Sequence, residues 1–182
     1  MRPGSVFLRK PRPSDKDEFL RLVRESRGLH RPWTLPPVDA KGFLRFLRRS
    51  KQPNVITVFA CERASGRIAG VFSVSEIVRG NFQSAYLGYY AHAAFAGRGL
   101  MSEGLRLLLR HAFTRAGLHR IEANIQPGNL VSIRLVRRQG FRREGFSPRY
   151  LKVAGRWKDH ERWAITREDW RARREVASRT PA

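Results

Sequence analysis

Gly97, Arg98 and Gly99 form a Gly-x-Gly turn where backbone groups could do chemistry. An aromatic, strand-like run (86–90) precedes the turn, and a long amphipathic run follows it. Glycine lets the backbone approach a ligand closely, and the first N–H groups of a helix have no partner inside the helix. Such N–H groups bind anions, so the turn predicts a site for a phosphorylated cofactor.

A dinucleotide is one cofactor that such a turn could bind. Gly97-x-Gly99-x-x-Ser102 approaches the Gly-x-Gly-x-x-Gly fingerprint, and Glu122 lies roughly 20 residues further on, where a ribose-binding acid would be expected. The setting disfavours this cofactor, because the fingerprint follows the first strand of a βαβ unit. Here three antiparallel-looking strands precede the turn, and too little chain remains for a second mononucleotide unit.

The strands and helices around the turn are predicted from periodicity and from cap residues. Residues 14–17 resemble a variant capping box, Asp39 can cap a second helix, and Gly140 is typical of a helix C-terminus. Residues 153–156 form a hairpin signal. The predicted strands are 5–10, 54–63, 67–78, 82–91, 119–125 and two after residue 140, and the predicted later helices are 99–116 and 129–139.

This order, β-α-α-β-β-β-α-β-α-β-β, predicts one α/β domain over residues 5–170. Its central sheet should be mixed, mostly antiparallel and flanked by helices. The basic C-terminal tail, 171–182, is expected to be a frayed helix or disordered.

Composition limits the class of protein. The 182 residues suffice for one good core, and the chain shows neither an apolar run of the roughly 18 residues a membrane span needs nor a signal-peptide core. The single cysteine, Cys61, fits a reducing compartment, so we expect a cytoplasmic protein. The net charge of +22 indicates either a partner rich in phosphate, such as RNA, or a GC-rich genome that favours Arg codons. Charge alone does not separate these two interpretations.

Two motifs together resemble the GNAT superfamily of acetyl-CoA-dependent N-acetyltransferases. The first is the turn within 94–99, where Ala94 replaces the family's opening Gln or Arg, and the second is an Asn-x-x-Ser helix that runs from Asn129 into Gly140-Phe141. The resemblance implies the GNAT fold and acetyl-CoA as cofactor. It also implies that the strand before the turn splays from its neighbour and binds the pantetheine chain through its open backbone groups.

A narrower resemblance is to the RimJ/RimL branch, which acetylates the N-terminal α-amine of ribosomal proteins. It rests on segments spread over nearly the whole chain: 29–33, 99–101, 119–123, 127–132 and 155–160. The branch implies a ribosomal-protein N-terminus starting with Ser, Ala or Thr as acceptor, a location near rRNA, no membrane, and a monomer or homodimer. A small-amine acetyltransferase and a basic RNA- or ribosome-associated module with a vestigial CoA site stay open as alternatives.

The resemblance also implies roles for individual residues. Glu122 is expected to be the general base, acting through water, and Asn124 on the same face could position that water or the substrate. The family's usual proton donor is replaced by Val136, which leaves Ser132 as the expected general acid. Trp33 could line the acceptor pocket. The residues expected to bind acetyl-CoA are Leu87, Tyr89, Tyr90, Ala94, Phe95, Ala96, Gly97, Arg98, Gly99, Leu100, Met101, Asn129 and Ser132.

The remaining polar candidates are expected to be structural. Glu103 lies in the first turns of a helix, where a carboxylate stabilises the helix dipole. The five histidines lack metal-ligand spacing, so no metal is predicted. Asp159 and His160 look like scaffold of the final hairpin.

Overall fold

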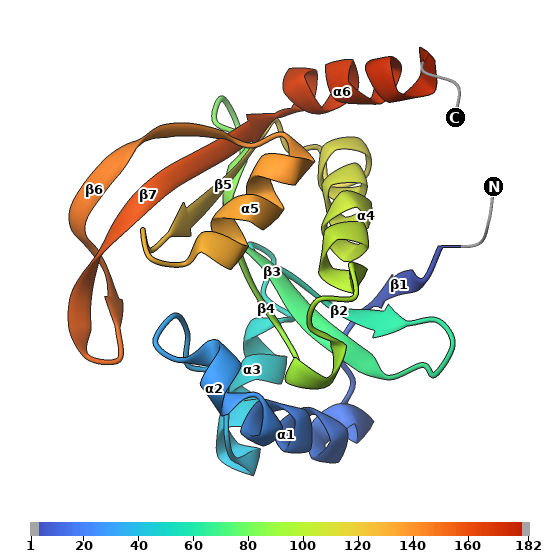
Figure 1. Ribbon diagram of the computed structural model, residues 1–182, viewed down its shortest axis with the longest axis vertical. Helices are drawn as coiled ribbons and strands as arrows, with labels where there is room; N and C mark the ends of the chain where they lie inside the picture. Colours follow the sequence, from blue (N-terminus) through green and yellow to red (C-terminus); the bar gives the residue numbers. More distant parts are fainter. Residues whose placement is uncertain (1–3, 180–182) are drawn as a thin grey trace.

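A computed structural model describes residues 4–179, and its centre is a seven-stranded sheet in the order β1-β2-β3-β4-β5-β7-β6 (Figure 1). The strands are β1 Val6–Arg9, β2 Ile56–Glu62, β3 Ile68–Val78, β4 Ser84–Ala91, β5 Arg120–Ile125, β6 Arg142–Val153 and β7 Arg156–Thr166. The helices are α1 Lys16–Glu25, α2 Arg27–His30, α3 Ala40–Arg49, α4 Leu100–Thr114, α5 Leu130–Gln139 and α6 Arg167–Arg179, with 3-10 turns at Pro13–Asp15 and Ala93–Phe95.

The sheet is mostly antiparallel, as predicted. Every neighbouring pair is antiparallel except β4 and β5, which are parallel because α4 forms the crossover between them. The mixed, mostly antiparallel sheet flanked by helices confirms the predicted fold class. The predicted strands and later helices agree with the observed ones to within two or three residues at each end.

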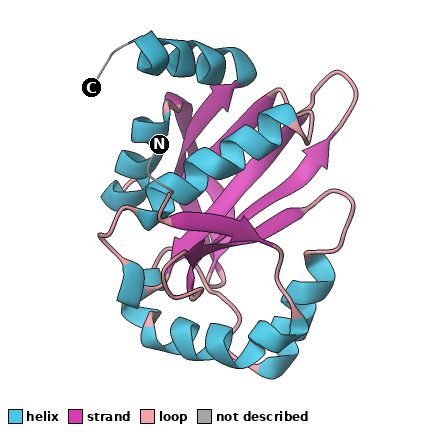
Figure 2. Ribbon diagram, turned by 90° about the vertical axis from the view of Figure 1, so that its right-hand side faces the viewer, coloured by secondary structure: helices cyan, strands magenta, loops and turns pink. Residues whose placement is uncertain are grey.

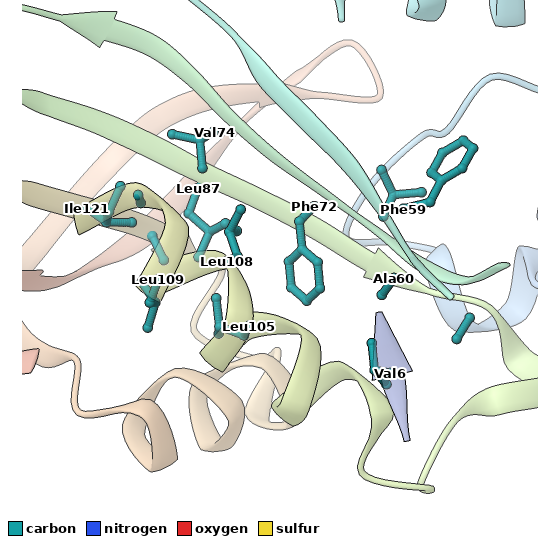
Figure 3. Close-up of a cluster of buried hydrophobic side chains, with 14 of the residues drawn as sticks. Val6, Phe59, Ala60, Phe72, Val74, Leu87, Leu105, Leu108, Leu109 and Ile121 are labelled. Carbon is teal, nitrogen blue, oxygen red and sulfur yellow. The ribbon is translucent and has the colours of Figure 1, made fainter. Parts of the chain in front are cut away.

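Helices cover both faces of the sheet. On one face α4 packs against β1, β2 and β3, and Gly104 makes this approach possible, because a Cβ there would lie 2.8 Å from the Phe72 ring (Figure 3). On the other face Phe19 of α1 packs between Phe43 of α3 and Phe59 of β2, with ring centroids 5.1 and 5.8 Å apart. Figures 1 and 2 show α1, α2 and α3 gathered at one end of the molecule and α6 at the other.

Local signals at helix ends have mixed outcomes. Asp39 caps α3 by accepting from the N–H of Gly42, and Gly140 ends α5 in the left-handed region, both as predicted. The capping box at residues 14–17 is wrong. The chain makes a 3-10 turn there. The Asp15 carboxylate accepts from the N–H of Arg12 and also from the Arg9 guanidinium, and these partners explain why the predicted box does not form.

The C-terminal segment is a helix through Arg179, and residues 180–182 lie outside the described part. This differs from a disordered tail, because α6 has an anchor: the Trp170 ring lies 5.5 Å from that of Phe113 on α4. A second link joins α6 to α5, where Arg173 donates to the carbonyl of Arg138.

Candidate active site

The Gly-x-Gly turn has the geometry of an anion cradle. Gly97 and Gly99 have φ values of 74° and 76°, in the left-handed region that glycine adopts without strain, and α4 begins at Leu100. The first bond of the helix runs from the Glu103 N–H to the Gly99 carbonyl. The N–H groups of the three residues before Glu103 therefore remain available to a phosphate.

A cavity of about 320 Å³ opens beside the turn. Its volume lies in the range of small-molecule sites. A Cβ added at Gly97 or Gly99 would meet no atom within 4 Å, so the space above the turn is free for a ligand. Of the residues expected to bind acetyl-CoA, those that line this cavity are Tyr89, Tyr90, Phe95, Ala96, Gly97, Gly99, Leu100, Met101, Asn129 and Ser132.

Three other expected cofactor residues lie outside this cavity. Ala94 is in the 3-10 turn before it, and Leu87 lines a neighbouring cavity instead. The Arg98 guanidinium forms an ion pair with Glu62 and lies 5.6 Å from the centroid of the Phe95 ring. The Arg98 side chain is therefore held by Glu62 and Phe95, and it is not part of the cavity lining.

Two arginines of α5 line the cavity, and sequence reasoning missed them. Arg134 and Arg138 are four residues apart, so both lie on the helix face that borders the cavity, together with Val131 and Leu135. Arginine pairs well with phosphate oxygens. The sequence contained a signal for them: along α5 the cavity-lining residues are three or four positions apart. This spacing places the two arginines on the same helix face as the expected cofactor residues.

The strands β4 and β5 splay apart as the resemblance implied. They pair only through Ser84–Tyr86 of β4 and Arg120–Glu122 of β5, and beyond that point each strand pairs only on its other side, with β3 and β7. The edge of β4 that faces β5 is open from Leu87 onward. An extended ligand such as a pantetheine chain can add to it like a further strand.

The N-terminus of α5 is fixed against β4. The Asn129 side chain accepts from the Ser132 N–H at 3.2 Å, and the Tyr89 hydroxyl donates to the Ser132 carbonyl, also at 3.2 Å. Burial raises the pKa of Tyr89 to about 12, so this hydroxyl stays protonated and keeps its role as donor. In the described part of the chain the hydroxyl of Ser132 itself has no hydrogen-bond partner, which leaves it free to serve a ligand.

A second cavity, of about 150 Å³, meets the first. The Gln126 side chain supports one wall by donating to the Trp33 carbonyl at 3.3 Å. Two elements far apart in the sequence, the segment after α2 and the start of α5, thus form the boundary between the cavities. The residues that line both are Trp33, Thr34, Tyr89, Asn129 and Ser132.

Asn124 and Glu122 lie on the same face of β5 and have different surroundings. Asn124 lines the second cavity, and its buried Oδ1 has no hydrogen-bond partner among residues 4–179. Glu122 lies at the vertex of the splay and lines neither cavity. Its carboxylate accepts from Arg120 Nε at 3.0 Å, and Arg120 also pairs with Glu144. The structure therefore brings Asn124, Trp33 and Ser132 together and places Glu122 outside this group.

A buried polar cluster closes the inner end of the first cavity. His30 Nε2 donates to the Ala91 carbonyl at 2.8 Å, and the Tyr90 hydroxyl is buried without a partner in the described part of the chain. Burial lowers the pKa of His30 and raises that of Tyr90. Both side chains are therefore neutral at physiological pH, and this end of the cavity carries no charge.

No group of three His, Cys, Asp or Glu side chains within residues 4–179 could hold a metal ion. No helix in this range is long and apolar enough to cross a membrane. Glu103, which was expected to be structural, accepts from the N–H groups of Ser5 and Val6.

Comparisons with known proteins agree with this geometry. The family model described as Acetyltransferase (GNAT) domain matches residues 5–142. A Bacillus subtilis protein named "Probable N-acetyltransferase YjcK" is 30% identical over 173 residues, which are 91% of this chain and 96% of that protein. The ribosomal protein uS5-alanine N-acetyltransferase of Escherichia coli is 42% identical over 103 residues, which are 57% of this chain and 53% of that relative.

A solved structure extends the likeness to the cofactor. Mycobacterium smegmatis RimJ in complex with CoA-disulfide has a TM-score of 0.84 and 29% identity, over 95% of this chain and 88% of that chain. The free backbone cradle at Gly97 and Gly99, the open edge of β4 and the arginines of α5 fit a CoA molecule. The matches and the site agree, and the chain belongs to the GNAT family of acetyl-CoA-dependent N-acetyltransferases, in its RimJ/RimL-like branch.

Proposed function

We propose that this enzyme acetylates the N-terminal α-amine of a protein, and that the acceptor is a ribosomal protein starting with Ser, Ala or Thr. The observation that carries this proposal is the second cavity, which is lined by no Asp or Glu side chain. A polyamine carries several positive charges and requires carboxylates around it. An N-terminal amine has a pKa of about 7.7–8.0, so a sizeable fraction is neutral near pH 7 and enters an uncharged cavity.

The name of the Escherichia coli relative supports the same acceptor class. That protein acts on ribosomal protein uS5, and its match covers about half of each chain. The net charge of +22 is compatible with work beside rRNA, as an enzyme for a ribosomal protein would need. The charge adds no information on which ribosomal protein is the acceptor.

The two cavities divide the reaction between them. Acetyl-CoA supplies an acetyl thioester, so that a C–N bond forms while the C–S bond breaks, and one proton must leave nitrogen and one must reach sulfur. The first cavity would hold the cofactor, with its phosphates at Gly97 and Gly99 and its pantetheine along β4. An N–H of Tyr89 or Tyr90 would donate to the thioester oxygen. The amine would enter from the second cavity, past Trp33.

Ser132 is proposed to donate the proton to the leaving sulfur. It lies on the boundary of both cavities, and its hydroxyl is unpartnered in the described part of the chain. Asn129 and Tyr89 hold its backbone, which fixes the position of the residue at this boundary. We expect Ser132→Ala to lower kcat and to leave the Kd of acetyl-CoA unchanged. An unchanged kcat would remove Ser132 as the donor.

Glu122 as general base stays a prediction. Its carboxylate lies outside both cavities and is held by Arg120, so it could act only through a bridging water. Glu122→Gln tests this role, because it preserves the shape of the side chain and removes its basicity. A kcat equal to that of the wild type would exclude Glu122.

The acceptor is tested by following thiol release from acetyl-CoA with three groups of substrates. Peptides starting with Ser, Ala or Thr should release thiol, and the same peptides with a blocked N-terminus should not. Spermidine and free amino acids stand for small-amine acceptors. Thiol release with small amines and with none of the peptides would overturn the proposal, and release with no substrate at all would favour the non-catalytic, RNA-associated alternative.

A further inference from the structure

His160 is placed in the cavity that the acceptor amine would enter. It lies on β7, and its side chain is 3% exposed. It lines the second cavity together with Asn124, Trp33 and Ser132. His160 was expected to be scaffold of the final hairpin, but such a role does not explain why its ring borders this cavity. The position of the ring therefore indicates a chemical role.

The hydrogen bonding of His160 defines which ring nitrogen is free. Its Nδ1 lies 2.9 Å from the carbonyl oxygen of Lys158. A carbonyl oxygen can only accept, so Nδ1 carries a proton and donates. Burial lowers the pKa of the ring below its ordinary value, and the ring is therefore neutral near pH 7. In a neutral ring with Nδ1 protonated, Nε2 bears a lone pair that can accept a proton.

The other residues that line this cavity cannot take up a proton near neutral pH. Their side chains are hydroxyls, amides, an indole and aliphatic groups, and none of them is Asp, Glu or Lys. Tyr89 has its pKa raised to about 12 and already donates to Ser132. Asn124 offers a carbonyl oxygen without a donor, which can accept one N–H of an amine and orient it.

We propose that His160, and not Glu122, is the general base of the reaction, taking the proton from the attacking amine through Nε2. The proposal rests on the proposed function and names a residue for its deprotonation step. As the nitrogen attacks, its lone pair forms the C–N bond and the nitrogen becomes positive and acidic. Its N–H proton passes to Nε2, the C–S bond breaks, and the sulfur receives a proton from Ser132. Solvent then restores Ser132 and His160, so the net proton transfer is from nitrogen to sulfur.

The titratable and charged groups near the ring come from several elements. Tyr150 on β6 contacts the ring, with ring centroids 6.1 Å apart. Asp159 precedes His160 in β7 and acts against the effect of burial by raising the pKa of the ring. Arg162 and Glu122 lie on the same face of the sheet by strand alternation, and His30 borders the neighbouring cavity.

The pH dependence of kcat/KM distinguishes this role from a structural one. For an N-terminal Ser peptide, log kcat/KM should rise with a slope of 2 below the pKa of His160, because both the ring and the amine must lose a proton. The slope should be 1 between that pKa and the amine pKa of about 7.7–8.0. His160→Asn retains a donor near the Lys158 carbonyl and removes Nε2. It should lower kcat/KM by about 10²–10⁴-fold and show a slope of 1 at every pH below the amine pKa.

Matched variants identify the origin of the steeper slope. His119→Asn changes an exposed histidine that pairs with Glu168 and borders neither cavity, and it should keep the wild-type profile. Glu122→Gln and His30→Asn should both retain the slope of 2. The proposal is overturned if His160→Asn keeps the slope of 2, or if the slope is lost in the Glu122 or His30 variant instead.

A second measurement does not depend on turnover. A ¹⁵N NMR titration of the imidazole in the free enzyme should show Nδ1 protonated, Nε2 unprotonated at pH 7, and a pKa below 6.5. A protonated Nε2 at pH 7 would refute the assignment even if His160→Asn is inactive. If the NMR titration gives the expected result but no peptide is a substrate, the proposed acceptor is refuted. The protonation state of the His160 ring is then still established.

Discussion

Gly97→Ala tests whether the turn binds the cofactor through its backbone. Gly97 has a φ of 74°, and a Cβ at this position meets no atom within 4 Å. The methyl group therefore clashes with nothing in the protein, and its effect on stability is only the strain of a left-handed alanine, about 1–2 kcal/mol. In a chain of this size that strain lowers Tm by about 2–8 °C.

The loss in the free energy of CoA binding should be larger than backbone strain alone would cause. The methyl group would occupy the free space through which a phosphate must approach the N–H groups at the start of α4. A hydrogen bond to a charged group contributes about 1.5–3 kcal/mol. Loss of one such bond raises the Kd of CoA by about 10- to 150-fold.

Gly66→Ala is the matched control. Gly66 lies in the turn between β2 and β3, has a φ of 71°, meets no atom within 4 Å and lines neither cavity. Its Tm should fall as much as that of Gly97→Ala, while isothermal titration calorimetry should give the wild-type Kd for CoA. A wild-type Kd for Gly97→Ala would refute the cradle, and an equal loss of affinity in both variants would show that the effect is general.

Four further variants test other parts of the structure. Arg138→Ala should raise the Kd of acetyl-CoA about 5-fold, through the loss of about 1 kcal/mol of binding free energy. Arg98→Ala should change this Kd less, because the Arg98 guanidinium pairs with Glu62. Calorimetry measures the Kd of both variants. Asp39→Ala removes the cap of α3 and should cost about 1 kcal/mol in urea unfolding, with kcat unchanged. Burial holds the pKa of His92 at about 3, below the 6.5 of an unfolded chain, so the unfolded chain binds a proton first as the pH falls. The wild type should therefore lose about 2 kcal/mol between pH 7.5 and pH 5 through this group, and urea unfolding of His92→Phe at the two pH values should show a smaller loss.

The fold could be predicted from the sequence because its signals are local. Helix ends at Asp39 and Gly140 depend on residues within one turn of each other. Strand and helix periods are repeated along each segment, and they indicated the order of the elements. The prediction failed at residues 14–17, because Asp15 has a competing partner in Arg9, six residues away on β1.

The cofactor turn and the Asn129 helix could be predicted from the sequence alone, since both are short motifs whose backbone geometry follows from their own residues. Which side chains share a cavity depends instead on how the strands and helices pack together. Arg98 is adjacent to the turn and points to Glu62, whereas Arg138 is 39 positions beyond Gly99 and lines the cavity. His160 reaches Asn124 only because β7 pairs with β5. Such contacts depend on strand order and on the face of each strand, which no local pattern specifies.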